Sequence, residues 1–543
     1  MFMKISKLAE ICKSNNPMRD EMQVLGSFVL FLLIVGILKL FVTSQTASSL
    51  LLSPHPTSFP ASFAPLNKPN SGLYLFLFSH IFSAQATMLS RSSLSRNAPR
   101  AFAAGRRSMA SAVNPAFQYD VSEASGVKVA NREVEGPTGT LALVAKAGSR
   151  YQPFPGFSDA LDRFAFKTTL KRSALRITRE TELLGGEISS THSRENIVLR
   201  TKFLSKDLPY FTELLAEVAT QTKFADHELN EVVSKLLKYK QQAVHSNPET
   251  VAVDAAHGVA FHRGLGASIT PSQSSPYEKY VSGDALAEFA QSAYSKSNIA
   301  LVASGPNSAE VSKWVGQFFK DTPTVNASSK YNVLPSVASK YYGGEQRIAS
   351  KIGNAVVIAF PGSSAFGTAG YKAEASVLAA LLGGESTIKW TPGFSLLSQA
   401  TKGFSQLRVS TQNNAYSDAG LFTVTLSGQA DQVGAASKNV VDALKKAAAG
   451  EVASEDIKKA IALAKFRALE SVQTLETGLE ATGSGLVHGN KPYQINEIAQ
   501  ALENVSEQQV KEVANTFLTG KATLVSVGDI HQLPFAEDLG LTV

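Results

Sequence analysis

Cysteine is almost absent from this chain of 543 residues, because Cys12 is the only one. Everything after Cys12 lacks a thiol. This excludes disulfides, thiolate zinc sites, iron–sulfur ligation and cysteine nucleophiles from the rest of the chain. A metal would have to be held there by histidine and carboxylate.

Sequence signatures of common active sites are also missing. The nine histidines are His55, His80, His192, His227, His245, His257, His262, His488 and His531. No two of these histidines have the i, i+4 spacing that places two zinc ligands on one helical face. There is no phosphate-binding glycine loop after a strand and no G-x-S-x-G elbow. We therefore predict no catalytic, cofactor-binding or metal-binding residues and no cofactor.

Charge is scarce, at 18% of residues, and its excess is confined to the N-terminal end. The formal charge of the whole chain is +7, but residues 1–111 carry +8 and residues 112–543 carry −1. The larger part therefore lacks the basic surface that nucleic-acid binding requires, and we expect no nucleic-acid partner.

Two different targeting signals stand near the N-terminus. Val24–Val42 is apolar apart from Lys39 and is close to the ~20 residues that span a bilayer, which indicates a transmembrane segment. Residues 88–111 are rich in Arg, Ser and Ala and contain no acid, which is typical of a mitochondrial transit peptide.

A transit peptide acts at a free N-terminus and should not follow a hydrophobic segment. Our hypothesis is that translation starts at Met88 and that residues 1–87 are an extension of the gene model. The alternative is a genuine membrane-anchored isoform that uses the segment 24–42.

From residue 112 the chain repeats one pattern twice. We predict domains at 112–320 and 338–543, joined by a linker at 321–337 that is rich in Pro, Ser and Asn. Strand-like apolar runs begin at Thr140 and Asn298 in the first half and at Ala355 and Ala522 in the second. Runs of period-two hydrophobicity begin at Glu195 and Gly420. Helical segments alternate with them, so we predict two α+β domains, each a sheet covered by helices.

Three segments carry a resemblance to a known family. Gly148–Thr169 and Glu182–Arg200 resemble the pitrilysin-type zinc peptidases, and Ala260–Ser272 resembles the A-F-R-G-L-G segment of that family. Active members carry H-x-x-E-H followed by a fragment such as F-K-G-T, which Phe166–Thr169 matches here. In those members two histidines and a later glutamate hold zinc, and the motif glutamate activates water.

The zinc-binding letters of that motif are replaced in this chain. The ligand positions fall on Asp159, Arg163 and Lys240, and the general-base position falls on Asp162. Arg163 presents only donors, and Lys240 would have to lose its proton to bind a metal. We interpret Asp159 and Asp162 as an N-cap and as carboxylates that complement a helix dipole. A salt-bridged cluster of the four residues is a further hypothesis.

The resemblance implies an inactive member whose two homologous domains each hold a mixed β-sheet. Two inactive branches exist: core subunits of the mitochondrial cytochrome bc1 complex, and the presequence-binding alpha subunit of the processing peptidase. The alpha subunit has a glycine-rich loop, whereas Leu381–Gln399 has only Gly383-Gly384 before Glu, Ile, Lys and Trp. This favours the bc1 branch, a structural subunit of the respiratory chain.

The partners implied for that branch are core protein 1 and other bc1 subunits. The location implied is the matrix side of the inner membrane, where membrane contact is made through partner subunits. A peptide in the former catalytic cleft is a further expectation.

Overall fold

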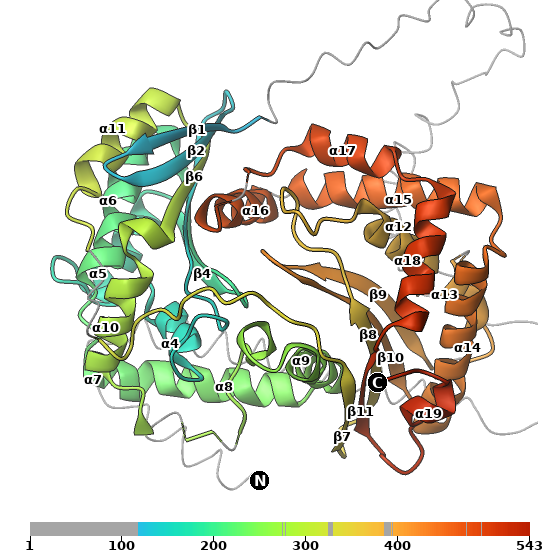
Figure 1. Ribbon diagram of the computed structural model, residues 1–543. Coiled ribbons are helices and arrows are strands. Elements are labelled where there is room, and N and C mark those ends of the chain that lie inside the picture. Colours follow the sequence, from blue (N-terminus) through green and yellow to red (C-terminus); the bar gives the residue numbers. More distant parts are fainter. Residues whose placement is uncertain are drawn as a thin grey trace, which may run out of the picture. The chain divides into compact units, whose positions relative to one another are not determined.

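The computed structural model describes residues 118–543, except 274, 277–278, 324–328, 385–392, 394, 405, 474 and 490. These residues belong to one compact unit, Arg107–Val543 (Figure 1). The segment 24–42, the predicted transit peptide 88–111 and the hypothesis about Met88 lie outside the described residues. Within them, no helix is both long and apolar enough to cross a membrane.

The first half forms a six-stranded mixed sheet. Its strands are β1 (Asp120–Ala124), β2 (Val127–Glu133), β3 (Thr138–Ala145), β4 (Glu187–His192), β5 (Ile197–Leu204) and β6 (Ile299–Gly305). The order across the sheet is β1-β2-β6-β3-β5-β4. Only the β2–β6 pair is parallel.

The second half repeats this topology with five strands. They are β7 (Gly344–Ala349), β8 (Asn354–Pro361), β9 (Arg408–Ala415), β10 (Gly420–Gly428) and β11 (Thr523–Gly528), in the order β7-β11-β8-β10-β9. The parallel pair, β7–β11, occupies the place of β2–β6. The prediction of two homologous α+β domains with mixed sheets is confirmed.

Helices connect the strands in corresponding order in the two halves. The first half has α4 (Phe157–Phe164), α5 (Ala174–Leu183), α6 (Leu208–Gln221), α7 (Asp226–Glu228), α8 (Ser234–His245), α9 (Pro248–Phe261), α10 (Gly283–Ala293) and α11 (Ser308–Phe318). A π-helical turn, Leu229–Val233, joins α7 to α8, and short 3₁₀ turns lie at Ser205–Asp207, Gly264–Gly266 and Lys296–Asn298. The second half has α12 (Ala373–Leu382), α13 (Leu396–Ala400), α14 (Ala430–Ala449), α15 (Ser454–Gln473), α16 (Leu475–Val487), α17 (Ile495–Glu503), α18 (Glu507–Thr519) and α19 (Ala536–Leu539).

Strands β3 and β8 read as unbroken apolar runs because both of their faces are buried. In β8 the larger side chains Val356, Ile358 and Phe360 face the main helical layer of the second half. Ala355, Val357 and Ala359 alternate with them and face the opposite side. The narrower side chains on that second face let a helix approach closely.

That second face is covered by a helix from the other half of the chain. Helix α9, from the first half, packs on β8, β10 and β11 through Ala252, Ala256, Ala260 and Phe261. Helix α16, from the second half, packs on β3 and β6 through Leu479, Leu486 and Val487. Figure 1 shows α9 beside β7, β8 and β11, and α16 beside β2 and β6. Each half therefore completes the core of the other.

Helix α9 starts at an Asn-Pro pair that caps it. Asn247 precedes Pro248, which removes one of the unpaired N–H groups at the helix start, and the Asn247 side chain accepts a hydrogen bond from the Glu249 N–H.

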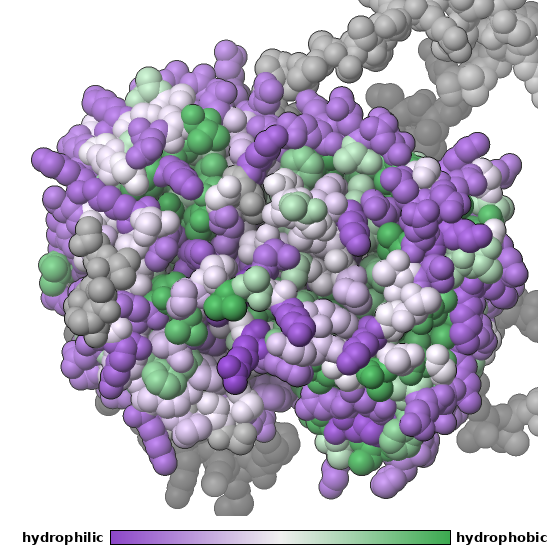
Figure 2. All heavy atoms as spheres, in the orientation of Figure 1, coloured by the Kyte–Doolittle hydropathy of each residue, from purple (hydrophilic) through white to green (hydrophobic). Residues whose placement is uncertain are grey.

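On the face shown in Figure 2, hydrophilic side chains predominate along the outer margins, and apolar side chains form smaller patches between them.

Candidate functional site

The four positions of the former zinc motif lie on two helices, α4 and α8. Helix α4 begins after Gly156, whose φ of 97° lies in the left-handed region that favours glycine. The Gln152 side chain accepts hydrogen bonds from the N–H groups of Gly156 and Ser158, which fixes the start of the helix. Asp159 is therefore in the first turn and is not the N-cap, so the predicted N-cap role is wrong.

Asp159 is instead one half of a buried ion pair. Lys240 Nζ donates to Asp159 Oδ1 at 2.9 Å, and the Asp159 side chain is 0% exposed. The Lys240 side chain is 23% exposed, so its aliphatic part is covered while its ammonium reaches inward. Two former ligand positions have thus become a cation and an anion that neutralise each other.

His192, at the end of β4, joins this pair to Asp162. Its Nδ1 donates to Asp162 Oδ2 at 2.8 Å. Its Nε2 lies 3.3 Å from Lys240 Nζ, and since an ammonium only donates, Nε2 accepts there. Ser190 Oγ donates to Asp162 Oδ1 at 2.5 Å. Burial opposes ionisation of Asp162, but the hydrogen bonds from His192 and Ser190 and the charge of Arg163 outweigh it. The pKa of Asp162 is therefore lowered.

The hypothesis of a salt-bridged cluster is confirmed for Asp159 and Lys240 and needs correction for Arg163. Arg163 Nε is buried and has no hydrogen-bond partner among the described residues. It acts on Asp162 through its charge alone. The fourth member is His192, which contacts both Asp162 and Lys240.

Asp159, Asp162 and His192 each offer one ligand atom, and these atoms lie within 4.8 Å of one another. Such a group could hold a cation in principle. Here, however, the Lys240 ammonium already lies within hydrogen-bond distance of Asp159 and His192. A divalent cation would have to displace it against charge repulsion, so the residues present fit an internal ion pair better than a zinc centre.

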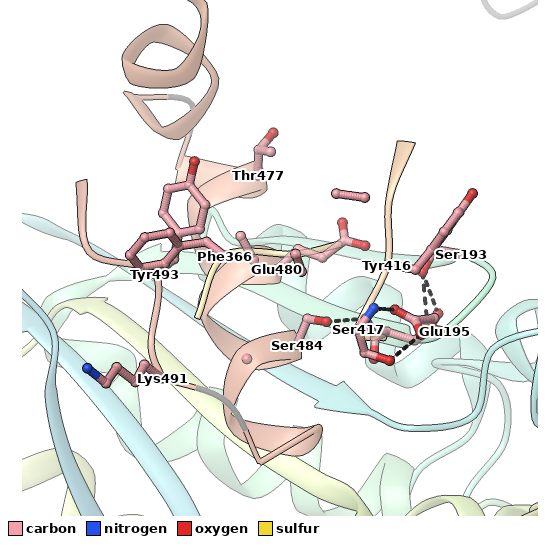
Figure 3. A pocket seen from close by; sticks show the side chains of 15 residues that line it. Ser193, Glu195, Phe366, Tyr416, Ser417, Thr477, Glu480, Ser484, Lys491 and Tyr493 are labelled. Atoms are coloured by element: carbon pink, nitrogen blue, oxygen red, sulfur yellow. Dashed lines mark hydrogen bonds between the residues drawn. The ribbon is translucent and has the colours of Figure 1, made fainter. Parts of the chain in front are cut away.

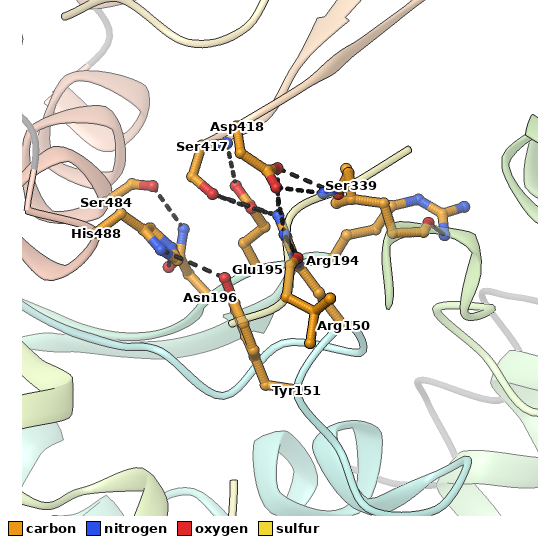
Figure 4. Close-up of polar contacts among 12 residues, drawn as sticks. Arg150, Tyr151, Arg194, Glu195, Asn196, Ser339, Ser417, Asp418, Ser484 and His488 are labelled. Atoms are coloured by element: carbon orange, nitrogen blue, oxygen red, sulfur yellow. Dashed lines mark hydrogen bonds and ion pairs between the residues drawn. The ribbon is translucent and has the colours of Figure 1, made fainter. Parts of the chain in front are cut away.

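A second polar cluster joins the two halves of the chain (Figure 4). Arg150, which follows β3, has a side chain only 2% exposed and donates to Glu195 Oε1 at 2.7 Å. The same guanidinium contacts both carboxylate oxygens of Asp418, in the β9–β10 turn, at 2.7 Å each. Burial opposes ionisation of Asp418, but Arg150 and Ser339 outweigh it and hold its pKa below the usual value.

The β4–β5 turn, which holds Glu195 and Asn196, makes further contacts with the second half of the chain. Glu195 accepts hydrogen bonds from the N–H and the hydroxyl of Ser417, at 2.9 and 2.6 Å. Asn196 Nδ2 donates to Ser484 Oγ of α16 at 2.9 Å. All these groups are satisfied by one another, which makes this cluster a structural joint.

Two buried histidines also lie at this joint. His257 of α9 donates from Nδ1 to the Val253 carbonyl, so its Nε2 accepts from the Tyr416 hydroxyl at 2.8 Å. Burial, assisted by the charge of Arg194, lowers the pKa of His257 to about 3. Burial likewise lowers the pKa of His488 to about 4. Both stay neutral in the folded protein near neutral pH.

Comparisons with known protein families agree with this architecture. Residues 128–271 match the family model described as insulinase (peptidase family M16), and residues 280–463 match the model described as peptidase M16 inactive domain. The chain belongs to peptidase family M16, as the resemblance of its segments predicts.

Individual relatives show which branch of family M16 this chain is similar to. The chain is 48% identical over 463 residues to the mitochondrial cytochrome b-c1 complex subunit 2 of Neurospora crassa, covering 84% of this chain and 100% of that protein. It is 37% identical to the subunit 2 of Cryptococcus neoformans (77% and 94% covered) and 29% identical to that of Rattus norvegicus (76% and 90%). Within family M16, the chain therefore groups with the cytochrome b-c1 complex subunit 2 proteins.

Proposed function

We propose that this chain is a non-catalytic core subunit of the mitochondrial ubiquinol–cytochrome c reductase, where it supports assembly and stability of the complex. The observation that carries this proposal is an intact M16 scaffold in which Lys240 pairs with Asp159 at two of the former ligand positions. Relatives named as subunit 2 of this complex cover most of the chain and support the same role.

We further propose core protein 1 and other subunits of the complex as partners, on the matrix side of the inner membrane. Exposed apolar side chains at corresponding places of the two halves support contact with partners. Leu236 and Tyr239 lie on α8, and Leu463 and Phe466 lie on α15. Aromatic side chains such as Tyr239 and Phe466 are enriched at protein interfaces.

For the N-terminal segments we propose a transit peptide at 88–111 and a start of translation at Met88. The Neurospora crassa relative is matched along its whole length by 84% of this chain. This supports the proposal that part of this chain is an extension with no counterpart in that relative. The domain boundaries 112–320 and 338–543, with the linker 321–337, remain a proposal as well.

The other candidate function is a presequence-binding alpha-type subunit of a processing peptidase, with a peptide in the former cleft. The departure of Leu381–Gln399 from a glycine-rich loop weighs against it. The curated relatives, which are named as bc1 subunits, weigh against it too.

The deciding experiment is native electrophoresis of digitonin-solubilised mitochondria, followed by haem spectra of the band that contains this chain. We expect a large band with haem b and haem c1. A haem-free pair with one M16 partner would refute the proposal and would make presequence binding the next measurement. Alkaline carbonate extraction should release the chain, because a peripheral subunit lacks the anchoring of a spanning helix.

A further inference from the structure

A pocket of about 420 Å³ lies between the two halves of the chain (Figure 3). The β4–β5 turn forms one side, and the β9–β10 turn and the loop after β8 form another. Helix α16, together with Lys491 and Tyr493, closes the remaining side. This pocket is distinct from the Asp159–Lys240 pair, since none of the residues of that pair lines it.

The walls of the pocket are largely apolar. Three aromatic rings contribute, those of Phe366, Tyr416 and Tyr493, together with small side chains such as Ala415 and Ala481. Most small-molecule sites combine such walls with a small number of polar groups that fix the orientation of the ligand. The faces of aromatic rings also attract organic cations.

Most polar groups at the pocket are already engaged, but Glu480 is not. Glu195 is held by Arg150 and Ser417, and Asn196 by Ser484. Among the residues that the structure describes, Glu480 of α16 has no hydrogen-bond partner. The one charge there that stabilises its ionised form is that of Arg200. Burial raises the pKa of Glu480 above its ordinary value.

The direction of the side chains leaves room for a ligand beside this carboxylate. Figure 3 shows Glu480 directed toward Tyr416, whereas the Lys491 side chain points away from it. Lys491 is exposed, and the charge that acts on the pKa of Glu480 is that of Arg200. A partly buried carboxylate that no cation hydrogen-bonds gains most from a ligand that supplies a cationic donor.

We propose that this pocket binds an organic cation, an ammonium, amidinium or guanidinium group on an apolar body, with Glu480 as its counter-ion. The aromatic rings would cover the apolar body, and the carboxylate would accept hydrogen bonds from the cationic head. This inference goes beyond the scaffold role and depends on neither the identity of the partners nor the former zinc site.

The test uses benzamidinium and its neutral isostere benzamide as probes. Saturation-transfer difference NMR is measured on the purified assembly that contains the chain, with the wild-type subunit or with Glu480→Gln. We expect benzamidinium binding to weaken at least fivefold in Glu480→Gln, while the weak benzamide signal is unchanged. Glu470→Gln, at an exposed glutamate of α15, is the matched control and should bind as the wild type does.

Equal binding of benzamidinium to the wild type and to Glu480→Gln would overturn the proposal, and so would equal signals from the two probes on the wild type. Native electrophoresis of each variant shows whether the assembly is intact, which separates a failure of this site from a failure of the scaffold role. Competition by acetyl-Leu-Arg-Leu-amide would identify a polypeptide side chain as the source of the cation. Benzamidinium binding without such competition would identify a free small molecule.

Discussion

At the scale of single residues, the Asp159–Lys240 pair makes the most direct prediction. Lys240→Met removes the cation and leaves the fully buried Asp159 carboxylate without it. Breaking a buried pair in this way costs about 3–5 kcal/mol, and the partial exposure of Lys240 reduces this to about 2–3 kcal/mol. Urea denaturation of the full chain, followed by fluorescence, measures the loss.

A matched control and a double variant separate charge pairing from other effects. Lys235→Met changes an exposed lysine on the same helix and should leave stability nearly unchanged. Asp159→Asn combined with Lys240→Met should recover part of the loss, because no buried charge remains unpaired. The interpretation fails if Lys240→Met is no less stable than Lys235→Met.

The sequence could predict this pair but not the whole cluster. Opposite charges at two former ligand positions predict contact between Asp159 and Lys240. His192 could not be assigned, because its distance from Asp162 depends on how α4 lies on β4, and no spacing within either segment encodes that packing. Arg163 has the same charge as Lys240, yet the geometry of α4 leaves its Nε without a hydrogen bond.

At the scale of elements, helix α16 depends on one small residue. A Cβ at Gly483 would lie 2.3 Å from Val144 Cγ2 and 2.8 Å from Val144 Cβ, on the face of β3. Glycine to alanine inside a helix ordinarily stabilises by about 1 kcal/mol. Here we expect Gly483→Ala to destabilise by about 1–3 kcal/mol, because the helix must shift away from the sheet. Thermal unfolding of the full chain measures this effect.

Gly316 of α11 provides the control for this substitution. Its nearest neighbour would lie 3.9 Å from an added Cβ, so Gly316→Ala has room and should be neutral or stabilising. Equal effects of the two substitutions would contradict the close approach of α16 to β3.

Most strands could be predicted from the sequence, whereas the exchange of α9 and α16 could not. The apolar runs at Thr140 and Ala355 correspond to β3 and β8, because a strand buried on both faces has a largely continuous apolar sequence. The period-two run at Gly420 corresponds to β10. Helix α9 presents small and apolar residues, but its composition does not specify which of the two sheets it covers. That choice depends on packing between segments far apart in the chain.

At the scale of the whole molecule, the joint between the halves should be sensitive to acid. The pKa values of His257 and His488 are lowered to about 3 and about 4 in the folded state, against 6.5 for an ordinary histidine. Between pH 6.5 and 4 the unfolded chain therefore takes up protons that the folded chain does not. As the pH is lowered through this range, the free energy of unfolding decreases by up to about 1.4 kcal/mol per pH unit for each histidine.

Urea denaturation at a series of pH values measures this slope. His257→Gln should reduce the slope even if it lowers stability overall, because one proton uptake is removed. His227→Gln, at an exposed histidine, serves as the control and should leave the slope as it is. A slope that is unchanged in His257→Gln would contradict the assignment.

The two halves should not be stable when produced separately. Residues 118–337 alone would expose the face of β3 and β6 that α16 covers, and residues 338–543 alone would expose the face that α9 covers. We expect each half to aggregate or to bind a hydrophobic dye strongly, and co-expression to restore solubility. Two soluble, cooperatively unfolding halves would show that the exchanged helices contribute little.

The exchange of α9 and α16 also determines when each sheet can be covered during synthesis of the chain. A chain leaves the ribosome from its N-terminus, so all six strands of the first sheet emerge before Leu475, where its covering helix begins. Until α16 arrives, one apolar face of that sheet is exposed to water and to other chains. We therefore expect the nascent first half to depend on a chaperone or on rapid completion of synthesis, and a ribosome that stalls between Gly305 and Leu475 to leave an aggregation-prone intermediate.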